Sequence, residues 1–144
     1  MSTTPTVEQV MTRNPATVSS TDSIRIAIER MRERGCRSLP VVDNNKLIGI
    51  VSDRDMRRAT NSPYVLREKW YDEFMLDQIP VRACMSPNPI TVTPLTELVE
   101  AAKLMRDHKI GGLPVVDGEF LVGIVTETDL LNYLIRILER QVDE

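Results

Sequence analysis

Two neighbouring segments of this chain are Leu39-Pro40-Val41-Val42-Asp43 and Leu47-Ile48-Gly49-Ile50-Val51-Ser52-Asp53-Arg54-Asp55. Both occur a second time, as Leu113-Pro114-Val115-Val116-Asp117 and Leu121-Val122-Gly123-Ile124-Val125-Thr126-Glu127-Thr128-Asp129. Working outward from them, residues 10–56 align with residues 84–130 at a constant offset of 74 without a gap, and 18 of the 47 positions are identical. Average composition gives roughly one chance match in sixteen. The two halves are therefore copies of one structural unit, which we expect to pack against each other.

Length and composition bound the class of protein. A chain of 144 residues with 42% hydrophobic content can bury one substantial core or two small fused ones, and we expect one compact unit. The longest apolar runs are far shorter than the ~18 residues of a membrane span. Residues 1–5 lack the charged and apolar regions of a secretory signal, so we expect a cytoplasmic protein. The net charge of −3 gives no general attraction to nucleic acid.

The two cysteines, Cys36 and Cys84, have no metal-ligand spacing and do not occupy matching positions of the repeat. We expect them to be buried free thiols, because unpaired cysteine often behaves as a small hydrophobic residue. No metal site is predicted.

Each copy begins with a short strand, at Thr17-Val18 and at Thr91-Val92, and continues as a helix. The helices are predicted by apolar residues at positions i, i+3, i+4 and i+7. These residues are Ile24, Ala27, Ile28 and Met31 in the first copy, and Leu98, Ala101, Ala102 and Met105 in the second. Thr21 and Thr96 are the predicted helix N-caps.

Two apolar strands follow the helix, near residues 38–42 and 46–51 in the first copy. They flank Asp43-Asn44-Asn45-Lys46, and the second copy has Asp117-Gly118-Glu119 at this place. Both patterns predict a β-hairpin. A second helix is expected directly after each Gly-Ile-Val segment. The order strand, helix, strand, strand, helix predicts an α/β unit with a small sheet and two helices.

A hydroxyl and a carboxylate lie three residues apart where each second strand passes into a helix: Ser52 with Asp55, and Thr126 with Asp129. This spacing places both side chains on one side of the first helical turn, near unpaired backbone N–H groups. Such a corner suits a sugar phosphate, because the carboxylate can accept from two ribose hydroxyls and the hydroxyl can bond a phosphate or ribose oxygen. Spacing alone favours a simpler role, in which these side chains cap the helices.

With these motifs in place, the chain resembles a tandem pair of cystathionine-β-synthase (CBS) domains, also called a Bateman module. The resemblance covers residues 7–60 and 81–138, joined by a helical, aromatic linker at 61–80. It implies an α/β fold of two tandem domains, each a small sheet with two helices, related by pseudo-two-fold symmetry. The short length and the Ser52-Asp53-Arg54-Asp55-Met56 text also resemble small free-standing bacterial CBS proteins of the acetoin-utilisation type. Shared domain text indicates the fold and not the pathway.

The resemblance implies that adenosine ligands bind in clefts between the two repeats. The matching Ser/Thr and Asp of CBS domains hold ribose and phosphate, which would be the role of Ser52, Asp55, Thr126 and Asp129. Arg37 stands where relatives carry a phosphate-contacting base, and Arg54 lies inside the first signature. The second copy has Gly111 and Thr128 instead, so the two copies are chemically unequal.

Further candidates would contact the base or the phosphates. His108 and Lys109 match positions that are basic in some nucleotide-sensing relatives, although a histidine at a helix C-terminus is more often a partner of the helix dipole. An apolar slot for adenine would be formed by Thr17, Val18, Pro40 and Val41, and by Thr91, Val92, Pro114 and Val115. Ordinary core packing is the alternative role. Proline within a strand indicates an edge, which would leave backbone groups available to a base.

Two segments lie outside the duplication. Residues 57–83 contain Tyr64, Trp70, Tyr71 and Phe74, and we expect a helix that covers one sheet edge rather than a surface for a partner. The C-terminal apolar residues Leu130, Leu131, Leu134, Ile135, Ile137 and Leu138 make a face wider than a single stripe. This face predicts a homodimer, and CBS pairs often form one.

No catalytic constellation is present: there is one histidine, no phosphate-binding glycine loop, and no nucleophile with a base beside it. We expect a regulatory module, not an enzyme, with no catalytic cofactor. Its ligand would be AMP, ADP, ATP or S-adenosylmethionine. The alternative is a ligand-free module that dimerises and docks a regulated target protein. Nucleic-acid binding is the weakest alternative, because the run Arg30, Arg32, Arg34 and Arg37 has no aromatic residues among it.

Overall fold

The computed structural model describes residues 4–60 and 76–143. The chain divides into two compact units, and not into the one that its length suggested. The first-repeat unit comprises residues 16–89, and the second-repeat unit comprises residues 1–15 together with 90–144. Each has its own apolar core, so each is described by itself.

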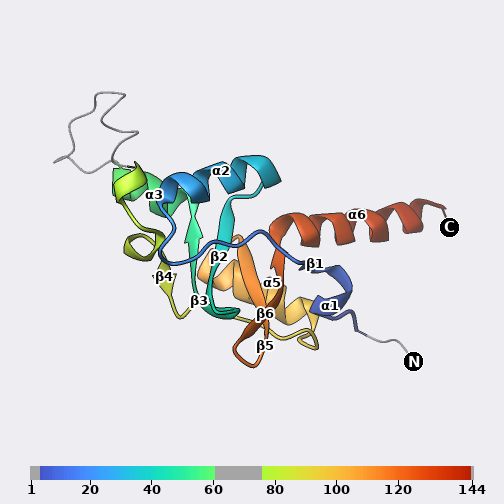
Figure 1. The fold of residues 1–144 in the computed structure, drawn as a ribbon. Helices are drawn as coiled ribbons and strands as arrows, with labels where there is room; N and C mark the ends of the chain where they lie inside the picture. Colours follow the sequence, from blue (N-terminus) through green and yellow to red (C-terminus); the bar gives the residue numbers. More distant parts are fainter. Residues whose placement is uncertain (1–3, 61–75, 144) are drawn as a thin grey trace. The chain divides into compact units, whose positions relative to one another are not determined.

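The first-repeat unit is built on the hairpin of β2 (Ser38–Asp43) and β3 (Lys46–Ser52), which pair antiparallel from Ser38↔Ser52 to Asp43↔Lys46 (Figure 1). Asn44 and Asn45 make the turn with φ of 53° and 65°, as a type I′ turn requires. The other elements are α2 (Ile24–Arg34), α3 (Asp53–Thr60), the 3₁₀ turn η1 (Val81–Ala83) and β4 (Ser86–Pro87), which pairs antiparallel with β3.

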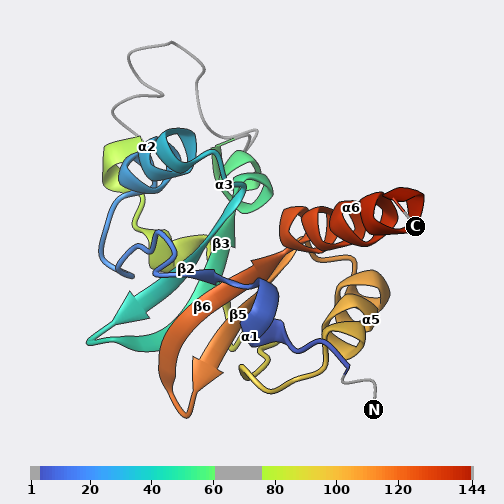
Figure 2. The same cartoon turned by 90° about the vertical axis from the view of Figure 1, so that its right-hand side faces the viewer.

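The second-repeat unit repeats this plan with β5 (Gly112–Asp117) and β6 (Phe120–Thr126), paired antiparallel from Gly112↔Thr126 to Asp117↔Phe120 (Figure 2). Its other elements are α1 (Val7–Val10), β1 (Thr12–Arg13), α5 (Leu98–His108) and α6 (Glu127–Asp143). β1 pairs antiparallel with β6, as β4 does with β3. The hairpin and the two helices predicted for each repeat are confirmed.

Both predicted helix caps are wrong. The N-cap of α2 is Ser23, whose hydroxyl accepts from the Ile26 N–H, and α5 begins after Glu97 without a side-chain cap. Thr96 Oγ1 instead accepts from the Thr93 N–H at 3.0 Å, one turn before the helix. The local loop therefore uses the threonine hydroxyl, and each helix begins at the first residue of its predicted apolar stripe, Ile24 or Leu98.

Each unit buries three of the four predicted stripe residues against its hairpin, and the fourth, Ile28 or Ala102, is half-buried. Ile24, Ala27 and Met31 of α2 lie in one cluster with Leu39, Val41 and Val51. The second cluster contains the matching residues Leu98, Ala101, Met105, Leu113, Val115 and Val125. The predicted strands at Thr17-Val18 and Thr91-Val92 are single parallel bridges, Val18↔Val41 and Val92↔Val115.

The segment at the start of each repeat packs on the unit that holds the other repeat, which the alignment of the two copies does not indicate. Val7 N–H donates to the Thr96 carbonyl (2.8 Å), and Val81 N–H donates to the Asp22 carbonyl (2.7 Å). Val7 and Val81 are both fully buried. The short elements α1 and β1, and η1 and β4, are thereby added to the two hairpins.

Part of the predicted linker helix lies outside the described residues, including Tyr64, Trp70, Tyr71 and Phe74; residues 76–78 are helical. Among the described residues, no helix has both the length and the apolar content needed to cross a membrane.

Candidate functional site

The first corner is the junction between β3 and α3. Ser52 N–H donates to Asp55 Oδ2 (2.9 Å), and Asp55 N–H donates to Ser52 Oγ (3.1 Å). The two side chains thus satisfy backbone donors of the junction reciprocally, as in a capping box. Asp55 Oδ1 has no hydrogen-bond partner within residues 4–60 and 76–143, and the Ser52 hydroxyl hydrogen is not donated to any group there.

The second corner is the junction between β6 and α6, and it repeats the same exchange. Thr126 N–H donates to Asp129 Oδ2 (2.9 Å), and Asp129 N–H donates to Thr126 Oγ1 (3.3 Å). Two bonds are added here: Thr126 Oγ1 lies 3.1 Å from Asp129 Oδ2, and Thr12 Oγ1 of β1 donates to Asp129 Oδ1 (3.2 Å). The second corner is therefore more fully satisfied by its own unit than the first.

Capping, the simpler role for these four residues, is present at both corners. It does not use up the first carboxylate, because a carboxylate has about four lone-pair sites and the Asp55 cap uses one of them. The cap fixes the orientation of the carboxylate and leaves Oδ1 available to a ligand.

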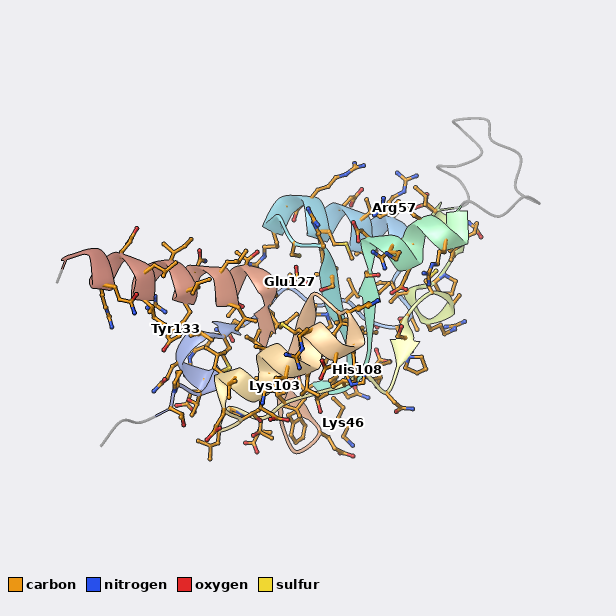
Figure 3. All side chains as sticks on the ribbon, turned by 180° about the vertical axis from the view of Figure 1, so that it is seen from behind. Lys46, Arg57, Lys103, His108, Glu127 and Tyr133 are labelled. Carbon is orange, nitrogen blue, oxygen red and sulfur yellow. The ribbon has the colours of Figure 1, made fainter. Side chains whose placement is uncertain are left out.

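Charge distinguishes the two corners. At the first, the backbone of Arg37 accepts from the Asp53 N–H (2.9 Å), so Arg37 joins the start of α3. Arg37 and Arg54 are exposed, and neither has an ion-pair partner in the described part of the chain. Asp53, the acid at the start of α3, pairs with Arg57 one turn along (3.1 Å); Figure 3 labels Arg57 on this helix. The result is a corner with surplus positive charge.

At the second corner, the Gly111 carbonyl accepts from the Glu127 N–H (3.0 Å), which matches the Arg37–Asp53 bond. A Cβ built on Gly111 would lie 3.8 Å from Glu127 Oε1, so a side chain at this position faces the glutamate. The Glu127 carboxylate forms no ion pair with another described residue, and Leu131 replaces the arginine one turn along α6. Thr128 replaces Arg54, and the corner has surplus negative charge.

His108 and Lys109 lie at the C-terminal end of α5 and are exposed. His108 occupies the last turn, where a positive charge is favourable toward the helix dipole. Lys109 is the C-cap in the left-handed conformation (φ 55°), at the place where α2 ends with Gly35 (φ 64°). Their predicted contact with a ligand stays a prediction.

The residues predicted to hold adenine lie largely in the two cores. Val18, Pro40 and Val41 are less than 2% exposed, as are Pro114 and Val115; Val92 is also buried, and Thr17 and Thr91 are half-buried. The backbone groups beside the prolines are used internally, because Val18 N–H donates to the Pro40 carbonyl (3.1 Å) and Val42 N–H to the Val18 carbonyl (2.8 Å). The expectation that the edge prolines leave these groups free is wrong.

A third polar cluster, not predicted from the sequence, surrounds Asp43. Its carboxylate accepts from Ser20 Oγ, from the Ser20 N–H (3.1 Å) and from Ser19 Oγ (2.9 Å). These bonds, foremost those from Ser20, hold the pKa of Asp43 below its ordinary value. In the second copy, Ser20 is replaced by Pro94, and proline has no backbone N–H to donate. Asp117 accepts no hydrogen bond from the described residues. This cluster fixes the loop before α2 to the hairpin.

Cys36 and Cys84 are free and half-buried, packed against the first-repeat core. Burial raises the pKa of both thiols, and the charge of Asp55 raises that of Cys84 further. Within residues 4–60 and 76–143, no three histidine, cysteine or acidic side chains are grouped as a metal site requires.

Comparison with known proteins shows which domain family the two repeats match. A model of the CBS domain family matches residues 7–62 and 81–136. A CBS domain-containing protein of Dictyostelium discoideum is 39% identical over 138 residues, which cover 92% of this chain and 93% of that protein.

Solved structures match the fold over nearly the whole chain. The structure of AcuB from Vibrio cholerae has 36% identity and a TM-score of 0.82, covering 99% of this chain and 98% of its own. CBSX2 in complex with AMP has 30% identity and a TM-score of 0.76, covering 92% and 98%. The CBS domain pair of protein MJ0100, in complex with 5′-methylthioadenosine and S-adenosylmethionine, has 26% identity and a TM-score of 0.75, covering 92% and 97%.

Proposed function

The chain belongs to the CBS domain family as a tandem pair, and from this membership we propose that it is a regulatory module for an adenosine-containing ligand. AMP, ADP, ATP and S-adenosylmethionine are the candidates. The observation that carries the proposal is the first corner, where Asp55 is oriented by its cap. Within the described residues, one oxygen of Asp55 accepts no hydrogen bond and the Ser52 hydroxyl donates none. Relatives with the same fold are solved with AMP and with S-adenosylmethionine.

The chemistry assigns a role to each group. Asp55 Oδ1 would accept from a ribose hydroxyl, and the Ser52 hydroxyl would donate to a phosphate or ribose oxygen. Arg37 and Arg54 would supply positive charge to the phosphates, since a guanidinium presents several donors in a planar array. None of these groups is arranged with a base and a nucleophile, so the module is proposed to bind and not to transform its ligand.

The test is ligand-dependent thermal stability, because a ligand that binds only the folded state raises the melting temperature. Replacing Asp55 with Ala removes a hydrogen bond to a charged group, worth ~1.5 to 3 kcal/mol, and should weaken adenosine binding by about one to two decades. Asp117→Ala is the matched control, since Asp117 is an exposed hairpin carboxylate with no described partner. If Asp55→Ala binds adenosine as tightly as the wild type, the carboxylate only caps the helix and does not contact the ligand.

A second function, association through α6, is favoured by one specific observation. Leu130 and Tyr133 pack against the second-repeat core, whereas Leu131, Leu134, Ile135 and Leu138 are 48–57% exposed. The exposed four follow the spacing i, i+3, i+4 and i+7, which is the stripe that packs against another helix. We propose that a second copy covers this stripe by two-fold symmetry, because the same face then meets itself. A regulated target protein is the alternative occupant.

A further inference from the structure

We propose that the two corners select ligands of opposite charge. The first takes a phosphate-bearing adenosine ligand, whereas the second discriminates against phosphate and takes a neutral or cationic adenosine compound. This inference rests on the proposed function and adds to it the ligand class of each corner. Glu127 is the residue to which it assigns the discrimination.

The starting point is the matched backbone frame. The Arg37 carbonyl accepts from the first N–H of α3 (2.9 Å), and the Gly111 carbonyl accepts from the first N–H of α6 (3.0 Å). A ligand held by Asp55 or by Asp129 would therefore meet the same backbone positions. The difference between the corners lies in the side chains attached to this frame.

Three substitutions shift the charge in the same direction. Arg37 is replaced by Gly111 and Arg54 by Thr128, so two cations without described partners are absent from the second corner. The acid at the start of the helix is kept, as Asp53 and Glu127, but its neutralising partner Arg57 is replaced by Leu131. At these aligned positions the first corner thus presents cations with a paired acid, and the second presents Glu127, which has no ion pair among the described residues, and no cation; Lys109, in place of Gly35, adds a cation two residues before Gly111.

Glu127 is close enough to act on a ligand at Asp129. Glu127 and Asp129 both lie in the first turn of α6, whose pitch is about 5.4 Å. A carboxylate and a phosphate separated by about this distance lie within the screening length of ~8 Å at physiological salt. Because Glu127 is exposed, the repulsion is that of a surface pair, which corresponds to about three- to tenfold in affinity.

The hydrogen bonds of the two aspartates also make the first corner the better site for a phosphate-bearing ligand. In the described residues, Asp55 Oδ1 accepts no hydrogen bond, whereas Asp129 Oδ1 already accepts one from Thr12. The second carboxylate therefore offers a ribose fewer free acceptor sites than the first.

The experiment is calorimetric titration of the full chain with adenosine, AMP and S-adenosylmethionine. Each corner is measured in a variant that disables the other, Asp129→Ala for the first corner and Asp55→Ala for the second. Asp129→Asn and Asp55→Asn replace these variants if the alanine forms do not fold by circular dichroism, because the amide oxygen can keep the cap. We expect the ratio of AMP affinity to adenosine affinity to be at least tenfold higher at the first corner.

Glu127→Gln, in the Asp55→Ala background, tests the assigned residue. It should raise AMP affinity about three- to tenfold, lower that of cationic S-adenosylmethionine and leave that of adenosine unchanged, with all differences shrinking at high salt. Glu139→Gln is the matched control: it removes the same charge from the same helix twelve residues away, about 18 Å along α6.

The outcomes separate the two proposals. If adenosine binds no variant, the proposed function itself fails. If adenosine binds both corners but the affinity ratios are equal, or if Glu127→Gln and Glu139→Gln have the same effect, the function stands and the charge selectivity is overturned.

Discussion

Replacing Asp43 with Ala is expected to destabilise the first-repeat unit far more than Asp117→Ala destabilises the second. The two carboxylates occupy the same hairpin position, but Asp43 accepts three hydrogen bonds and Asp117 accepts none within the described residues. A typical hydrogen bond contributes about 1 kcal/mol net. Since Ser20 is buried and would lose its acceptor, we expect a loss of about 2 to 3 kcal/mol for Asp43→Ala. Asp117→Ala should change the free energy of unfolding by at most about 0.5 kcal/mol.

The effect of Asp43 should depend on pH in a defined direction. Its folded-state pKa is lowered, chiefly by the bonds from Ser20, so the folded state binds this proton more weakly than the unfolded state. The stability that Asp43 contributes is therefore fully present above its unfolded pKa of about 3.9 and is lost as pH falls through the lower folded-state value. The stability difference between wild type and Asp43→Ala should narrow below about pH 4.

Urea unfolding followed by circular dichroism, at several pH values between 7 and 3, measures both effects. Asp43→Asn is an informative third variant, because it keeps a neutral acceptor and should remove the pH-dependent part alone. Equal destabilisation by Asp43→Ala and Asp117→Ala, or a difference that stays constant down to pH 3, would refute the reasoning.

Three further predictions concern the sheet, the phosphate and the oligomer. Gly49→Ala should lower the free energy of unfolding by about 1 to 3 kcal/mol in urea titrations, because the new Cβ would lie 2.8 Å from the Ser86 carbonyl oxygen; Gly111→Ala, with no atom nearer than 3.8 Å, is the control. Arg37→Ala should weaken AMP binding about three- to tenfold in calorimetry and leave adenosine binding unchanged. Equal losses of affinity for both ligands would show that Arg37 does not contact the phosphate. Leu134→Glu combined with Leu138→Glu should convert a dimer into monomers in light scattering, and a monomeric wild type at micromolar concentration would contradict the dimer.

The sequence predicted those elements that carry a long periodic pattern. The helix stripes of α2 and α5 and the hairpins were confirmed because apolar period and turn residues specify them locally. The two-residue strands β1 and β4 were missed, since such short segments have no measurable period. Their place is set by close backbone approach to Gly49 and Gly123, which is a tertiary contact.

The alignment of the two repeats located both candidate corners, but the differences in charge and hydrogen bonding between them were only partly predictable. Arg37 and Arg54 against Gly111 and Thr128 can be read directly from the aligned copies. The bond from Thr12 to Asp129 cannot, because Thr12 belongs to a segment 117 residues away whose packing partner is not indicated by the repeat. The Asp43 cluster was missed for a similar reason: it depends on the loop conformation at Ser19 and Ser20.

Capping and ligand binding are compatible at the first corner, and their separation can be measured in one variant. The cap uses Oδ2 of Asp55, and Oδ1 accepts no hydrogen bond from the part of the chain that the structure describes, so the same carboxylate can hold the helix start and accept from a ribose. A pre-oriented acceptor loses little side-chain entropy when the ligand arrives, which favours binding without adding a contact. In Asp55→Asn the amide oxygen can still accept from the Ser52 N–H, but the charge that strengthens a ribose bond is gone. If the carboxylate has both roles, Asp55→Asn should keep most of its stability and lose affinity for the adenosine ligand. If the carboxylate only caps the helix, this variant should bind the ligand as the wild type does.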